Sequence, residues 1–136
     1  MIVVDSSVWI DFFTGKNTPC VEKLDDSLGE DVVAIGDLMI AEVLQGFRTE
    51  SDYRKAKALL LSLTILNMLD TDITLKSAAN FRRLRKKGVT VRKTVDTIIA
   101  TYCIENRLPL LHSDRDFQPF QEHLKLQVVH QQNFRT

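Results

Sequence analysis

The sequence contains little cysteine and histidine, and neither residue type has the spacing of a structural site. The two cysteines, Cys20 and Cys103, form no CxxC pair. The three histidines, His112, His123 and His130, do not have the spacing of a zinc site. We therefore expect a reduced chain without a disulfide framework or a zinc centre, in which both thiols are small buried side chains.

Long hydrophobic runs are also lacking. The longest covers residues 59–69, is interrupted by Ser62, Thr64 and Asn67, and is too short to span a bilayer. The first residues, MIVVD, already have the pattern of a strand, so no signal segment is expected. These absences predict a cytoplasmic protein without a membrane partner.

The chain has no excess charge of either sign. Its 18 basic and 18 acidic residues give a formal net charge of zero, which excludes attraction of the whole molecule to nucleic acid or to an anionic membrane. Any such role must come from a local patch. The chain of 136 residues is long enough for one core but not for two. We expect a single domain over residues 1–136.

Apolar stretches of two kinds alternate along the chain. Strand-like runs cover residues 2–4, 32–35, about 64–68, 108–112 and 127–130. Helix-like runs cover residues 6–13, 20–28, 37–47, 51–63, 72–87 and 94–106. This alternation predicts an α/β fold, with a central parallel β-sheet flanked by helices on both faces (α/β/α).

Acids lie within or directly after four of these apolar stretches, where a folded core would normally exclude them. They are Asp5, Glu42, Asp96, Asp114 and Asp116. A carboxylate on an apolar face is costly unless it is paired or binds a metal. Asp5 ends the first strand and Asp114 follows the fourth, and reactive groups in parallel sheets gather at the carboxyl ends of strands. The pattern favours a hard divalent cation and a metal-dependent enzyme that acts on phosphate esters.

Four sequence blocks carry these acids: MIVVDSSVWIDFF, IAEVLQGF, GVTVRKTVDTIIA and LLHSDRDF. In order and separation they resemble the motifs of PIN-domain ribonucleases, specifically the VapC-type toxins of type II toxin–antitoxin pairs, over almost the whole chain. The resemblance implies a PIN-like fold and an Mg²⁺-dependent endoribonuclease in which Mn²⁺ can substitute. It also implies a structured RNA substrate, tRNA or rRNA, cleaved by metal-activated water attack on the phosphodiester. The implied partners are a small VapB-like antitoxin and a second copy of the chain in a homodimer, with higher assembly on the antitoxin.

The resemblance also implies roles for the five acids. Asp5, Asp96 and one of Asp114 and Asp116 are expected to bind metal. Glu42 is expected either to bind metal or to orient a metal-bound water. Without metal, clustered carboxylates repel one another and raise each other's pKa values.

Other residues of the four blocks are auxiliary candidates. Ser6 or Ser7 could hydrogen-bond a ligand carboxylate or a substrate phosphate, although hydroxyls after a strand are often only helix caps. Arg92 could contact the RNA backbone or pair with an active-site acid. His112 stands where many family members have Ser or Thr, so no hydroxyl role is carried over to it.

A basic run precedes and enters the third block. From Ile73 to Val95 there is no acid, while eight residues are basic: Lys76, Arg82, Arg83, Arg85, Lys86, Lys87, Arg92 and Lys93. The RNA-contact candidates among them are Arg85, Lys86, Lys87, Arg92 and Lys93. The alternative is an ordinary solvated helix face.

Two other functions stay open. One is a magnesium-dependent phosphatase or phosphotransferase on small substrates, although a haloacid-dehalogenase-type enzyme would need a second Asp where Ser7 stands. The other is a catalytically inactive PIN scaffold that only binds RNA or protein. Intact acids in all four blocks argue against that scaffold.

Overall fold

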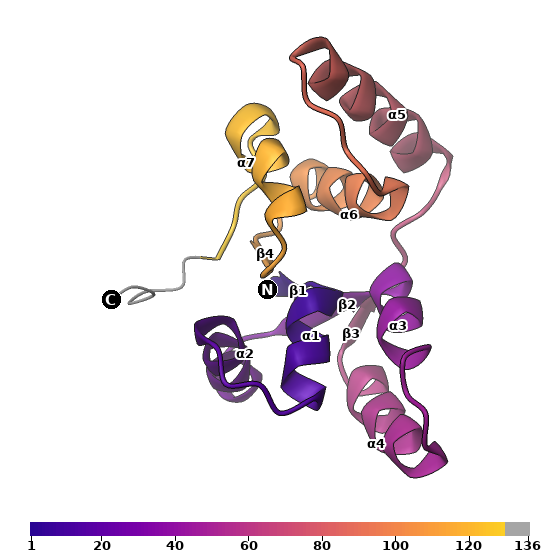
Figure 1. The fold of residues 1–136 in the computed structure, drawn as a ribbon, viewed down its shortest axis with the longest axis vertical. Helices are drawn as coiled ribbons and strands as arrows, with labels where there is room; N and C mark the ends of the chain where they lie inside the picture. The colour runs from indigo at the N-terminus through magenta and orange to yellow at the C-terminus, as the bar shows by residue number, and fades with distance from the viewer. Residues whose placement is uncertain (130–136) are drawn as a thin grey trace.

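A computed structural model describes residues 1–129 and arranges them around a parallel four-stranded sheet in the order β3–β2–β1–β4 (Figure 1). The strands are β1 (Ile2–Val4), β2 (Val33–Gly36), β3 (Thr64–Leu66) and β4 (Leu110–Leu111). They lie within or overlap the first four strand-like runs of the sequence. Of the fifth run, Val128 forms an isolated bridge with Leu110, and residue 130 lies outside the described residues.

Helices cover both faces of this sheet, as the sequence predicts. They are α1 (Ser6–Phe13), α2 (Pro19–Glu30), α3 (Asp37–Leu44), α4 (Glu50–Leu61), α5 (Thr71–Lys86), α6 (Thr94–Glu105) and α7 (Gln118–Leu124), with a short 3₁₀ turn, η1 (Arg115–Phe117). Figure 1 shows α1 to α4 on one side of the strands and α5 to α7 on the other. Right-handed crossovers produce this division, because the chain moves from β1 to β3 in one direction and returns past β1 to β4.

The helix boundaries follow from local hydrogen-bonding chemistry. Asp5, Thr18, Thr49 and Asp70 each accept a hydrogen bond from a backbone N–H in the first turn of the helix that follows. Gly88, with φ of 81°, lies just after α5, in a conformation that ends helices at little cost for glycine. Side-chain caps therefore fix the starts of α1, α2, α4 and α5, whereas α3 and α6, which carry Glu42 and Asp96, begin without one.

The core lies on both faces of the central strands. Val3, Val4, Leu110 and Leu111 have no exposed surface, as expected for parallel strands covered by helices. Trp9 is also fully buried, and its ring lies 5.8 Å from that of Phe13 and 5.7 Å from that of Phe12. No helix in the described part of the chain is long and apolar enough to cross a membrane.

Candidate active site

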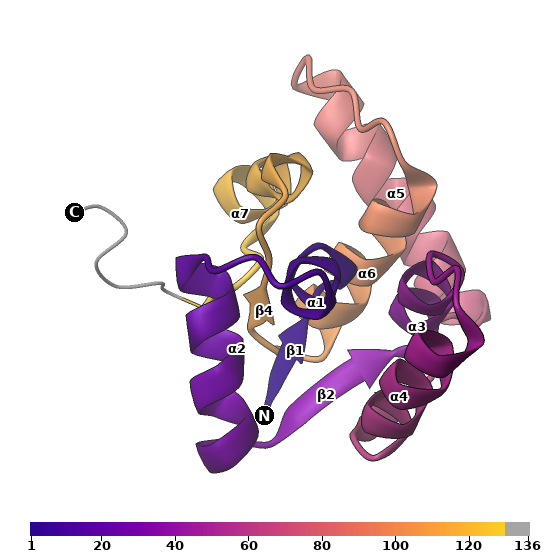
Figure 2. The same cartoon turned by 60° about the horizontal axis from the view of Figure 1, so that its bottom comes forward.

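The carboxyl ends of β1 and β4 bring the first and last acidic blocks together. These strands are neighbours, with Val4 paired to Leu111, and Figure 2 shows α1 at the carboxyl end of β1. Asp5 follows β1, and its Oδ2 accepts a hydrogen bond of 3.0 Å from the Ser7 N–H at the start of α1. Asp114 follows β4 and caps η1 in the same way, since its Oδ1 accepts from the Asp116 N–H at 2.9 Å.

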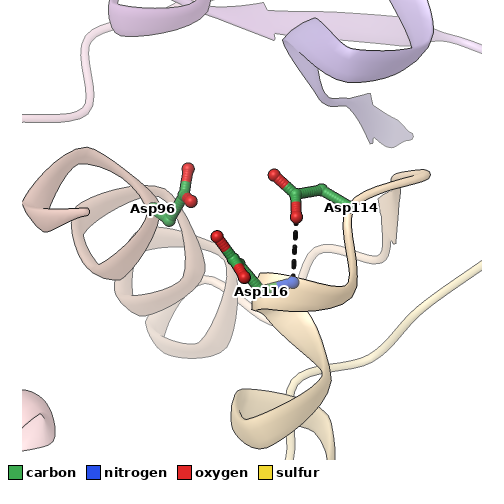
Figure 3. A group of neighbouring side chains, drawn as sticks. All are labelled: Asp96, Asp114 and Asp116. Carbon is green, nitrogen blue, oxygen red and sulfur yellow. Dashed lines mark hydrogen bonds between the residues drawn. The ribbon is translucent and has the colours of Figure 1, made fainter. Parts of the chain in front are cut away.

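Three carboxylates form a compact cluster at this edge. Asp96 projects from the first turn of α6 toward the turn that carries Asp114 and Asp116 (Figure 3). One oxygen from each of the three lies within 4.8 Å of the other two. We call these three residues the acid cluster. Its spacing suits carboxylates that share a cation.

Asp5 and Glu42 lie beside the acid cluster but are not members of it. Asp5 is buried, while Glu42 is half-buried on α3 and accepts a hydrogen bond of 3.0 Å from the Ser6 hydroxyl. The charges of Asp5 and Glu42 both act on Asp96. The structure thus gathers all five predicted acids around one region, three of them closely.

Burial makes the ionised acids unfavourable in the metal-free protein. It raises the pKa of Asp96 from 3.8 to about 7, and the charges of Asp5, Asp114 and Glu42 add to this. Burial likewise raises the pKa values of Asp5 and Glu42. A divalent cation would reverse this tendency, because it stabilises the ionised forms.

Two adjacent basic residues partly offset the negative charge. Nζ of Lys93 lies 3.9 Å from Oδ2 of Asp96 and 3.7 Å from Oδ2 of Asp114. Arg92 donates through Nη2 to both carboxylate oxygens of Asp116, at 3.0 and 3.2 Å. Of the two roles considered for Arg92, the structure therefore shows pairing with a site acid.

The donor set fits a hard divalent ion. Oδ1 of Asp5 and Oδ2 of Asp96 are both fully buried, and within residues 1–129 neither has a hydrogen-bond partner. A buried oxygen without a partner is costly, and a bound ion would remove that cost. The available ligands are carboxylate oxygens, which suit Mg²⁺ or Mn²⁺ better than softer metals.

The remaining predicted residues have different places. The Ser7 hydroxyl accepts from the Ser113 N–H at 3.2 Å and so ties the end of β1 to the segment after β4. His112 Nδ1 accepts from the Asp114 N–H at 3.3 Å, and burial lowers its pKa. This hydrogen bond holds the start of the turn that carries Asp114.

The basic candidates on α5 are not brought to the acid cluster. Arg85, Lys86 and Lys87 are exposed at the C-terminal end of α5, and among the described residues none of them forms an ion pair with the five acids. Sequence reasoning did not identify Lys93 as a partner of two site acids. Its position three residues before Asp96, on the same face of a helix start, was the available signal.

Comparisons with known proteins agree with the motifs. A family model described as PIN domain matches residues 2–122. Ribonuclease VapC11 of Mycobacterium tuberculosis is 28% identical over 132 residues, which are 95% of this chain and 98% of that protein. Among solved structures, FitAcB from Neisseria gonorrhoeae matches with a TM-score of 0.75 at 18% identity, covering 98% of this chain and 99% of that one.

A second solved structure supports the same fold. VapBC2 from Rickettsia felis, bound to a DNA fragment from the promoter of its genes, matches with a TM-score of 0.73 at 17% identity. The match covers 95% of this chain and 98% of that chain. The VapC resemblance seen in the sequence is thus confirmed. Since the family model matches residues 2–122, which are most of the chain, the chain belongs to the PIN-domain family.

Proposed function

We propose that this protein is an Mg²⁺-dependent endoribonuclease and the toxin of a VapBC-type pair. The observation that carries the proposal is the acid cluster at the carboxyl ends of β1 and β4, together with buried oxygens of Asp5 and Asp96 that have no hydrogen-bond partner in the described residues. The family match supports it, as does a relative that is itself named a ribonuclease. We also propose that residues 1–136 form a single PIN domain.

The acids divide into those that hold metal and those that orient water. Asp5, Asp96 and Asp114 hold the ion or ions. We choose Asp114 over Asp116 as the fourth main acid, because Arg92 already pairs with both oxygens of Asp116. A bound divalent ion supplies Lewis acidity, which lowers the pKa of water and neutralises charge that develops on the phosphate.

Glu42 has the placement of a residue that orients the attacking water. The Ser6 hydroxyl holds one of its oxygens at 3.0 Å, and burial raises its pKa, which makes the carboxylate a better proton acceptor. Ser6 thus acts through Glu42, while Ser7 acts on the architecture of the site. Attack would release 5′-phosphate and 3′-hydroxyl ends.

The substrate we propose is a structured RNA, tRNA or rRNA, in the cytoplasm. Five basic residues would guide its backbone: Arg85, Lys86, Lys87, Arg92 and Lys93. Arg85, Lys86 and Lys87 lie on one helix end and Arg92 and Lys93 lie beside the acid cluster, so together they could follow an extended phosphate backbone.

The partners we propose are a small antitoxin and a second copy of the chain. An antitoxin can silence the site by laying an Arg or Lys on the acids, where Lys93 already lies. Its apolar anchors could contact Leu61 and Ile65, which are 50% and 40% exposed. Trp9 itself is fully buried and is inaccessible to a partner.

The test is cleavage of bulk RNA by the purified protein in Mg²⁺, in Mn²⁺ and in chelator. We expect cleavage only with metal, and none from Asp5→Asn or Asp96→Asn. Asp26→Asn, an exposed acid on α2, is the matched control and should cleave normally. Cleavage in chelator would contradict the proposal. Hydrolysis of a small phosphate monoester without RNA cleavage would favour the phosphatase alternative, and binding of RNA without any hydrolysis would favour the inactive scaffold.

A further inference from the structure

A groove that the acid cluster does not use lies between α5 and α6. Its volume is about 500 Å³. Its lining residues include Ser77, Phe81, Arg82 and Arg85 from α5, and Thr97 and Ile98 from α6. In Figures 1 and 2 the segment between the two helices runs back alongside α5 to the start of α6. The groove is therefore formed by consecutive parts of the chain.

Two hydroxyls in this groove are buried without a partner. Ser77 and Thr97 are 5% and 2% exposed, and within residues 1–129 neither Oγ of Ser77 nor Oγ1 of Thr97 has a hydrogen-bond partner. Native proteins leave few buried polar atoms unpaired, and each calls for an explanation. A ligand with hydrogen-bonding groups, seated between the helices, would supply the missing partners once the two hydroxyls rotate toward it.

The walls of the groove combine flat apolar surface with positive charge. The Arg85 guanidinium lies over the Phe81 ring, with its carbon 5.7 Å from the ring centre. Arg82 lines the same groove and is exposed. An aromatic ring and guanidinium planes are the surfaces on which unpaired bases stack, and the cations attract the backbone phosphates. A purely apolar occupant would leave both hydroxyls unpaired and both cations unused.

The groove also lies within reach of the proposed reaction. Thr97 and Ile98 line it from one face of α6, while Asp96 faces the acid cluster on another (Figure 3). A helix with its side chains is about 10–12 Å across. An RNA strand that crosses the first turn of α6 would pass from the groove to the acids within a few nucleotides.

We propose that this groove is a subsite for one unpaired nucleotide of the RNA substrate, a few positions from the cleaved bond. The proposal rests on the proposed ribonuclease function and adds a site that recognises one base of the substrate. The base stacks on Phe81 and Arg85, its polar edge pairs with the hydroxyls of Ser77 and Thr97 after these rotate toward the groove, and Arg82 contacts its phosphate.

Binding of RNA to the full-length Asp96→Asn protein tests the subsite without cleavage. The probe is a short fluorescein-labelled single-stranded RNA in Mg²⁺, and the readout is fluorescence anisotropy. Adding Ser77→Ala and Thr97→Val should weaken binding by about tenfold, because a hydrogen-bonded base loses its partners. The same pair should leave the melting temperature unchanged or higher, because the removed hydroxyls have no partners within the described part of the free protein.

Matched variants distinguish the contribution of positive charge to RNA binding from that of base recognition by the hydroxyls. Arg82→Gln should lower the slope of log affinity against log salt by about one, whereas the hydroxyl variants should leave that slope as it is. Ser51→Ala, an exposed serine on α4, is the control and should bind normally. RNA that carries a photoreactive uridine should crosslink to Phe81 or a residue beside it.

Other outcomes would overturn the subsite. Normal RNA affinity in the Ser77→Ala, Thr97→Val protein would do so, as would crosslinks confined to other elements. If the variants instead shift the sedimentation of the protein alone, the groove is a contact between two copies and not a nucleotide site. These results are independent of whether the unmutated protein cleaves RNA in Mg²⁺, so failure of the subsite and failure of the ribonuclease proposal remain distinguishable.

Discussion

The ammonium nitrogen of Lys93 lies 3.7 Å from a carboxylate oxygen of Asp114. The same nitrogen lies 3.9 Å from Oδ2 of Asp96, so one flexible cation spans two members of the acid cluster. These are distances of ion pairing without a short hydrogen bond, and the Lys93 side chain is 55% exposed. Lys93 can therefore leave at low cost when a stronger cation arrives.

Replacing Lys93 by Gln should strengthen divalent metal binding. Removal of a neighbouring positive charge makes the acid cluster more negative, and we expect the apparent affinity for Mg²⁺ to rise by about five- to tenfold. The metal-free protein should melt at a lower temperature, because the carboxylates lose a neutralising partner. Melting curves across a Mg²⁺ titration measure both effects.

Lys86→Gln is the matched control for this prediction, because Lys86 is exposed on α5 and forms no ion pair with the cluster among the described residues. Its melting curves should follow those of the unmutated protein. A smaller metal-induced rise in melting temperature in Lys93→Gln would mean that the lysine assists metal binding and does not compete with it.

The stability of the metal-free protein should depend on the protonation of Asp96. Burial raises its pKa from 3.8 to about 7 in the folded state, so the folded protein binds this proton more tightly than the unfolded chain. The stabilisation is complete below the unfolded value and is lost as the pH rises through about 7. The free energy of unfolding in chelator should fall over this window by an amount on the order of 3 kcal/mol.

Urea unfolding of the unmutated protein and of Asp96→Asn at several pH values measures this effect. The Asn variant should have a smaller loss of stability between about pH 5 and pH 8, since its side chain has no proton to release. His112 acts in the opposite direction because burial lowers its pKa, and the difference between the two proteins removes its contribution. Parallel pH profiles would show that Asp96 is ionised throughout.

Much of this site could be predicted because the acids follow strands or lie in apolar helices. Asp5 follows MIVV, and Asp114 follows LPLLHS. The prediction that these two acids lie close together required only that their parallel strands be neighbours, and β1 and β4 are neighbours. Apolar periodicity also located α1 to α6 to within three residues at their ends. In both cases the local signal and the tertiary packing agree.

The features that the sequence did not predict depend on contacts between residues distant in sequence, or lie in segments too short to have a periodic pattern. α7 has seven residues with Pro119 near its start and follows η1 directly, so no helical period could develop. The run over 127–130 has strand-like residues, but within the described part only Val128 bridges to the sheet. The groove beside Ser77 and Thr97 required the packing of α5 on α6, which composition does not encode.

Ser6→Ala should impair cleavage through Glu42. The Ser6 hydroxyl donates to Oε1 of Glu42 at 3.0 Å and lowers its pKa against the effect of burial. Without it, Glu42 becomes mobile and its pKa rises further, so we expect kcat to fall by about tenfold, the equivalent of one hydrogen bond to a charged group. The acidic limb of the pH profile of kcat should also move to higher pH.

Steady-state cleavage at several pH values measures both changes. Ser6→Thr keeps the hydroxyl and should restore most of kcat, whereas Ser51→Ala, the exposed serine on α4, should have no effect. A decrease in kcat without any shift of the pH profile would mean that Ser6 acts on packing and not on the Glu42 carboxylate.

The basic end of α5 should contribute to RNA affinity and not to chemistry. Lys86 and Lys87 are exposed and, among the described residues, form no ion pair with the acids, so replacing both by Gln should raise KM and leave kcat at saturating RNA nearly unchanged. The slope of log affinity against log salt should fall by about two, since roughly one counterion is released for each phosphate that a basic side chain neutralises. Arg54→Gln with Lys55→Gln, two exposed basic residues on α4, removes the same charge elsewhere and should preserve the slope. If the α4 pair changes the slope and the α5 pair does not, the RNA backbone follows the opposite face of the sheet.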